Sequence, residues 1–161
     1  WPAAVMALDA EIKVVGPAGE RWVKCGEFFL GLLMSVLEPD EIVTAIKVPI
    51  TGSDKTAYLK AAPRSSGFAV VGVAVRLALD GNGTCNRMAV GITGVGDKAY
   101  RAEWVEQRLT GNKLDSKSIQ EAAAQSTRNI EVIEDINGSS EYRKHLTEVY
   151  VVRAIEAALK G

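Results

Sequence analysis

The chain has 161 residues, which is enough for one ordinary domain or for parts of two small ones. Hydrophobic residues make up 47% and charged residues 24%, a composition that excludes a disordered or collagen-like chain. The 19 basic and 20 acidic residues are spread along the sequence and give a net charge of −1. This balance argues against nucleic acid or an anionic membrane as a partner.

The metal-ligating residue types are few. Cys25 and Cys85 lie far apart, without a CxxC pair, and the single histidine is His145, which argues against a zinc or iron–sulfur site. Two unpaired thiols suit a reducing compartment. The sequence has no apolar run of about 18 residues and no signal-peptide start, so we expect a cytoplasmic protein without membrane insertion.

The first fifty residues predict a short helix followed by strands. The opening Trp1 without an initiator Met suggests the C-terminal piece of a longer polypeptide, and residues 3–8 read as the last turns of a helix. Two alternating segments around the turn 16–19 predict a β-hairpin. Residues 26–36 are expected to form a short helix or an irregular packing segment, and residues 42–48 alternate as a strand does.

A boundary between two parts is predicted at residues 51–54, a Thr-Gly-Ser-Asp segment typical of a linker. Beyond it, residues 56–62 alternate again and predict a strand, which the loop 63–67 interrupts. The almost continuously apolar run 68–79 predicts a central strand, joined by a tight turn to a further strand over residues 85–93.

The remainder is predicted to be helical. Three helices are expected: one around Ala102–Leu109, a second capped by Asp115, and a third and longest one capped by Ser139 or Ser140. Strands grouped before helices indicate an α+β fold with a small antiparallel sheet followed by three C-terminal helices, rather than an alternating α/β fold.

Two segments are candidates for chemistry. Gly91–Gly96 has the spacing GxxGxG, which differs from the phosphate-binding GxGxxG, so we interpret it as a structural turn. The strand over residues 56–62 places Tyr58 and Lys60 on one face, beside the loop 63–68. A lysine there can donate a hydrogen bond to a carbonyl oxygen of an electron-rich ring and stabilise its reduced form. From the pattern alone an ordinary surface strand is the favoured interpretation.

The order of these segments resembles the FAD-binding medium subunits of molybdenum hydroxylases, the carbon monoxide dehydrogenase and xanthine dehydrogenase family. The resemblance extends over essentially the whole chain. It is carried by Ala7–Ala10, Phe28–Phe29, Leu37–Ile42, Ile46–Pro49, Tyr58–Lys60, Gly67–Ala74, Gly91–Gly96, Arg101–Ala102 and Ser140–Lys144.

The resemblance implies a flavoprotein subunit of an oxidoreductase complex. In that family the subunit holds FAD, which takes electrons from the molybdenum cofactor through two 2Fe-2S clusters on partner subunits and passes them to an external acceptor. The implied partners are a large molybdenum-binding subunit and a small iron–sulfur subunit in a hetero-oligomer.

The resemblance also assigns three cofactor-binding residues. Lys60 matches a lysine near the polar edge of the isoalloxazine ring, Val43 matches a position whose backbone approaches the cofactor, and Phe68 matches a residue in the loop beside the ring. No catalytic residue and no metal ligand is assigned. Many relatives carry an aspartate just before the position of Phe68, where this chain has Gly67.

By the same resemblance, residues 1–51 form the truncated end of an α+β FAD-binding domain, and residues 56–161 resemble the carbon monoxide dehydrogenase flavoprotein C-terminal domain. The glycine-rich segments that bind the FAD pyrophosphate in the family would precede Trp1. We therefore expect weak or no FAD binding and no activity by the isolated chain. The alternative is a non-catalytic protein-interaction module whose sheet and helices dock onto other proteins.

Overall fold

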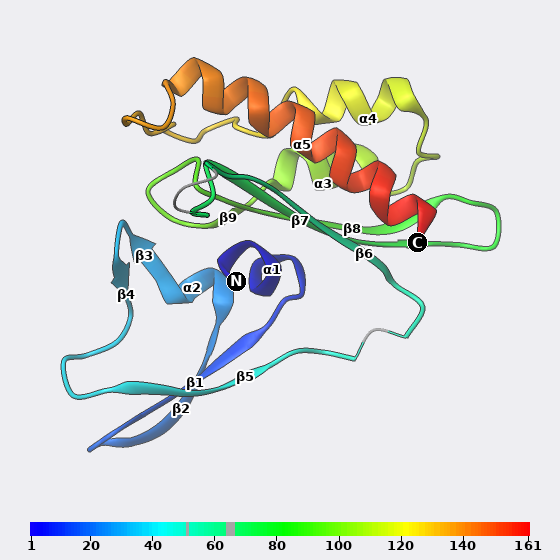
Figure 1. Cartoon of the computed structure of the whole chain (residues 1–161). Coiled ribbons are helices and arrows are strands. Elements are labelled where there is room, and N and C mark those ends of the chain that lie inside the picture. The colour runs from blue at the N-terminus through cyan, green and yellow to red at the C-terminus, as the bar shows by residue number, and fades with distance from the viewer. Residues whose placement is uncertain (51, 64–66) are drawn as a thin grey trace.

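The computed structural model describes residues 1–50, 52–63 and 67–161. Within these ranges the chain forms two β-sheets, a short β-ribbon and five helices (Figure 1). The elements are α1 (Pro2–Ala7), β1 (Glu11–Gly16), β2 (Gly19–Lys24), α2 (Cys25–Phe28), β3 (Phe29–Gly31), β4 (Met34–Ser35), β5 (Ile42–Lys47), β6 (Lys55–Ala61), β7 (Val71–Leu79), β8 (Cys85–Thr93), β9 (Tyr100–Arg101), α3 (Glu103–Leu109), α4 (Ser116–Ala123) and α5 (Ser140–Lys160).

The first part of the chain is built on a three-stranded antiparallel sheet in the order β2-β1-β5. The β1–β2 hairpin and strand β5 lie where the sequence predicts them. Ile12 and Val14 point to the buried side of β1 and pack with Val5 and Met6 of α1. Residues 26–36 contain the expected short helix, α2, but the β3–β4 ribbon that follows it is not expected from the sequence.

The second part is a four-stranded antiparallel sheet in the order β6-β7-β8-β9. Helices α3, α4 and α5 cover one face of this sheet, and α1 lies on the other side (Figure 1). Sheet followed by three helices confirms the predicted α+β arrangement of this part. Two of the predicted capping residues act as N-caps, Asp115 through a capping box for α4 and Ser139 through the amide of Tyr142 for α5.

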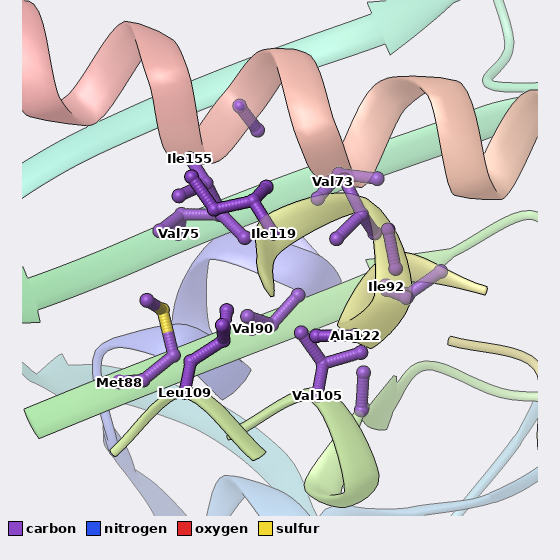
Figure 2. Packing of buried hydrophobic residues seen from close by; sticks show 14 of the residues in the cluster. Val73, Val75, Met88, Val90, Ile92, Val105, Leu109, Ile119, Ala122 and Ile155 are labelled. Carbon is purple, nitrogen blue, oxygen red and sulfur yellow. The ribbon is translucent and has the colours of Figure 1, made fainter. Parts of the chain in front are cut away.

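The main core lies between the sheet and the helices. Val73 and Val75 of β7 point to the helix side and pack against Ile155 of α5 and Ile119 of α4 (Figure 2). The opposite face of β7 carries small residues and Arg76, and there Ala74 packs against α1. Because both faces are covered, β7 reads as a nearly continuous apolar run rather than an alternating one.

Strand β7 begins at Val71, three residues later than the sequence predicts. The amide of Val70 donates to Ala61 O on β6 at 2.8 Å, but the carbonyl oxygen of Val70 accepts from the Arg143 side chain of α5 at 2.8 Å. The hydrogen-bond ladder between β6 and β7 therefore ends at Val70, because the Val70 carbonyl is bound by a side chain and not by a neighbouring strand.

Candidate functional site

The exposed face of β6 carries the residues singled out from the sequence. Strand β6 is an edge strand whose register pairs Tyr58 with Ala74 and Lys60 with Gly72. Directly opposed residues share a face, so Tyr58 and Lys60 point away from the helices, toward the side on which α1 lies. Tyr58 is 45% exposed and Lys60 is also exposed, so this surface is open rather than sealed in the core.

A glycine shapes the position of the Tyr58 side chain. A Cβ placed on Gly72 would lie 2.9 Å from Tyr58 Oη and 3.0 Å from Thr93 Cγ2. The phenol therefore leans over β7 toward β8, across space that only glycine leaves free. Partial burial of the phenol raises the pKa of Tyr58. Tyr58, with Gly72 buried beneath it and the half-buried Thr93 beside it, forms a surface next to Lys60 that we call the platform; its solvent-exposed part is the Tyr58 side chain.

Helix α1 covers only part of this face of the sheet. Ala3 and Ala7 pack against Ala74, and a Cβ on Gly91 would lie 2.1 Å from Ala3 O. The backbone of α1 therefore lies so close to β8 that only a residue without a side chain fits at position 91. The platform at the β6 edge lies beyond this contact and remains open.

The segment of residues 67–70, which we call the Phe68 loop, adjoins the platform. Lys60 Nζ donates a hydrogen bond to Gly67 O at 2.7 Å, so the lysine and the Phe68 loop lie together. The Phe68 side chain is 81% exposed. Three residues of the predicted loop, 64–66, lie outside the described residues, as does Thr51 of the predicted linker.

Val43 is placed apart from the other two predicted residues. It lies in β5 of the first sheet, paired with Val14 of β1, and its half-buried side chain packs against the core of the first part. The structure therefore brings together Lys60 and the Phe68 loop, whereas Val43 sits in a different sheet.

Sequence reasoning missed several residues that build this region. Gly72 and Thr93 shape the platform from neighbouring strands, and Arg143 binds the loop backbone from α5. Which residues lie opposite each other on neighbouring strands, and which loop a distant arginine binds, cannot be seen in a local sequence pattern. A signal for Arg143 is its position four and eight residues before the buried Thr147 and Val151 on the last helix, because arginine on a buried helix face needs a specific partner.

Residues 91–93 of the segment Gly91–Gly96 belong to β8, and its glycines pack against other segments of backbone. Gly91 is required by the approach of α1. Gly94 has φ +82°, and a Cβ on it would lie 2.5 Å from Ala69 O and 2.9 Å from Val70 O. Both glycines are thus explained by backbone packing.

The described residues offer no metal site and no membrane-spanning helix. Within the described ranges there is no cluster of three histidine, cysteine or acidic side chains that could hold a metal. No helix among the same residues is long and apolar enough to cross a membrane.

The open platform fits one face of a flat ring system. Tyr58 offers an exposed aromatic surface, Lys60 offers an ammonium donor at one side, and the absence of a Cβ on the buried Gly72 lets the phenol lie against the sheet. The residues present therefore suit contact with a flavin ring. Only one side of such a ring would be covered by this platform.

Two family models match the chain. Residues 56–158 match the CO dehydrogenase flavoprotein C-terminal domain, and residues 1–51 match the FAD binding domain in molybdopterin dehydrogenase. The chain is 33% identical over 155 residues to the glyceraldehyde dehydrogenase medium chain of Sulfolobus acidocaldarius, covering 96% of this chain and 55% of that one. It is 32% identical over 158 residues to the carbon monoxide dehydrogenase medium chain of Hydrogenophaga pseudoflava, covering 98% and 55%.

Solved structures show the same fold. The carbon monoxide dehydrogenase from Hydrogenophaga pseudoflava matches with a TM-score of 0.93 at 32% identity, over 99% of this chain and 55% of that chain. The quinoline 2-oxidoreductase from Pseudomonas putida 86 matches with a TM-score of 0.89 at 27% identity, over 99% and 55%. The chain spans about half the length of the curated relatives it matches.

Proposed function

Because the chain belongs to the FAD-binding medium-chain family of molybdenum hydroxylases, we propose that it is the C-terminal portion of a flavoprotein subunit that relays electrons through FAD to an external acceptor. The observation that carries this proposal is the open platform of Tyr58, Gly72 and Thr93 beside Lys60. Helix α1 covers the neighbouring part of the same sheet face at Ala74 and does not cover Tyr58.

Each residue of the platform has a distinct proposed role. FAD, when bound, supplies the redox chemistry by accepting electrons and passing them on. Tyr58 provides a flat aromatic contact, and Lys60 donates a hydrogen bond to a carbonyl oxygen at the polar edge of the ring. An ammonium held there favours negative charge on the ring. Phe68 and the backbone of Val43 remain proposed cofactor contacts.

The first part of the chain, residues 1–51, is proposed to be the end of the FAD-binding domain, and residues 56–161 the C-terminal domain that covers the ring. Exposed apolar side chains on and after β5 support the view that the first part packs against further protein. These residues are Ile42, Ile46, Val48 and Ile50. The isolated chain is accordingly expected to bind FAD weakly or not at all and to be inactive.

The proposed setting is a cytoplasmic hetero-oligomer. The relatives include medium chains and subunits of named dehydrogenases and hydroxylases, among them the nicotine 6-hydroxylase medium subunit of Paenarthrobacter nicotinovorans. By that likeness we propose a large molybdenum-binding subunit and a small 2Fe-2S subunit as partners. Substrate oxidation would take place on the large subunit, and this chain would take part in electron transfer only.

The test is FAD binding by the full-length subunit that contains this chain. Purified subunit is expected to show flavin absorbance, and Tyr58→Ala is expected to weaken FAD binding about tenfold, which corresponds to roughly 1.4 kcal/mol. Trp104→Ala is the matched control, because Trp104 is an aromatic residue of similar exposure on the helical side of the sheet. A correctly folded full-length subunit without flavin would favour the protein-interaction module instead.

A further inference from the structure

Arg143 is a buried arginine that joins three segments distant in the sequence. It lies in the first turns of α5 and is 2% exposed. Its Nη1 donates to Val70 O at 2.8 Å and to Gly94 O at 2.6 Å, and its Nη2 donates to Asp135 Oδ1 at 2.5 Å. A buried guanidinium with carbonyl and carboxylate acceptors fixes the groups it binds, because leaving either side unpaired would be costly.

The two carbonyl acceptors belong to the segments that flank the platform. Val70 ends the loop that leads from β6 to β7, and Gly94 begins the turn after β8. At Gly94, where φ is +82°, a Cβ would lie 2.5 Å from Ala69 O. The backbone of residues 69–70 is therefore enclosed between the Gly94 turn and the Arg143 side chain.

The same loop holds the ammonium of Lys60. The Val70 amide is bonded to Ala61 O on β6, and three positions earlier Gly67 O accepts from Lys60 Nζ at 2.7 Å. The place of Gly67 O depends on where the loop is anchored, and the anchor on the helical side is Arg143. Arg143 and Lys60 are thus connected through the backbone of residues 67–70, which each of them binds at one end.

We propose that Arg143 is a positioning residue for the flavin site, which holds the Phe68 loop in place and, through Gly67 O, sets the location of the Lys60 ammonium. The role of Lys60 toward the ring rests on the proposed function. Anchoring of the loop by Arg143 does not, and it can be measured without a cofactor.

The first experiment follows hydrogen exchange of the Val70 amide in the full-length subunit. Arg143→Met is expected to accelerate this exchange about tenfold or more, because the loop loses its charged anchor. Val151→Ala, which removes buried methyl groups from the same helix two turns further along, is the control for general loss of stability. It should leave the ratio of Val70 exchange to that of the rest of the sheet unchanged.

The second experiment is a double-mutant cycle on the flavin midpoint potential of the same subunit. Arg143→Met should shift the potential in the same direction as Lys60→Met, and it should produce no further shift once Lys60 is Met. Arg143→Lys keeps a cation that can reach one carbonyl and should recover part of the parent potential. It also serves as the folded variant if Arg143→Met does not accumulate.

The outcomes separate the two proposals. If Lys60→Met leaves the potential unchanged, the proposed role of Lys60 is wrong, while the exchange measurement still decides whether Arg143 anchors the loop. Unchanged Val70 exchange in the Arg143 variants overturns the anchoring. Equal potential shifts with and without Lys60 overturn the connection from Arg143 to the lysine.

Discussion

Arg76 of the central strand β7 donates a 2.5 Å hydrogen bond from Nη2 to Oδ2 of Asp9, the residue that follows the end of α1 by two positions. Arg76 is 4% exposed, and its Nη1 also donates to Leu8 O at 3.1 Å. The other carboxylate oxygen of Asp9 accepts from Arg101 Nη1 at 2.5 Å. One carboxylate in the first part of the chain therefore binds two arginines of the second.

Asp9→Asn is expected to lower the free energy of unfolding by roughly 1–2 kcal/mol, because two arginines lose a charged acceptor although Asp9 itself is partly exposed. Asparagine tolerates the positive φ of 51° at this position, so the backbone is not the cause of the loss. Urea denaturation measures the effect. Asp97→Asn, at an exposed position, should change stability by less than about 0.5 kcal/mol, and an equal loss in both variants would contradict the prediction.

Gly91→Ala is expected to destabilise the protein by roughly 3 kcal/mol, because the new Cβ would lie 2.1 Å from a backbone oxygen of α1 that cannot rotate away. Gly81→Ala is the matched control, since no atom lies within 4 Å of a Cβ there. The measurement is the melting temperature of each variant in thermal unfolding. Similar melting temperatures would show that α1 does not require the bare backbone of β8.

Lowering the pH is expected to reduce the free energy of unfolding, in part by protonating Asp115, the N-cap of α4. The Ser118 amide donates to Asp115 Oδ1 at 2.7 Å and lowers the pKa of Asp115 below its usual 3.8. The folded state then binds fewer protons than the unfolded state, so this stabilisation is complete above about pH 5 and is lost as the pH falls through the lowered value.

Asp115→Asn is therefore expected to reduce the fall in unfolding free energy between about pH 5 and pH 2, with little change at pH 7 because asparagine also caps helices. Urea titrations at several pH values measure the slope. Ser139→Asn exchanges one uncharged cap for another at α5 and should keep the parent slope. An unaltered slope in Asp115→Asn would exclude this carboxylate as a source of acid sensitivity.

Lys60→Met in the full-length subunit is expected to lower the flavin midpoint potential by roughly 30–60 mV, the two-electron equivalent of losing one charged hydrogen bond to the reduced ring. Redox titration followed by visible absorbance measures it. Lys144→Met removes an exposed lysine on α5 and should leave the potential unchanged. A potential unaffected by the Lys60 substitution would remove this lysine from the mechanism.

Local patterns predict most of the elements. The alternation in β5 and β6, the turn between β7 and β8, and the caps Asp115 and Ser139 each act over a few residues, so the sequence displays them directly. The β3–β4 ribbon is not predicted, because its strands have only three and two residues and are too short to show a period. The prediction starts β7 three residues too early, because residues 68–70 are nearly as apolar as the strand that follows them.

The sequence by itself determined the α+β class and the placement of Tyr58 and Lys60 on one face of a strand, since a period of two residues fixes which side chains share a face. Only the tertiary structure decided that this face stays open beside α1, that Gly72 makes room for Tyr58, and that Arg143 anchors the loop next to Lys60. Those relationships join residues far apart in the chain. They depend on strand register and on how helices pack against the sheet, and neither leaves a periodic signal in the sequence.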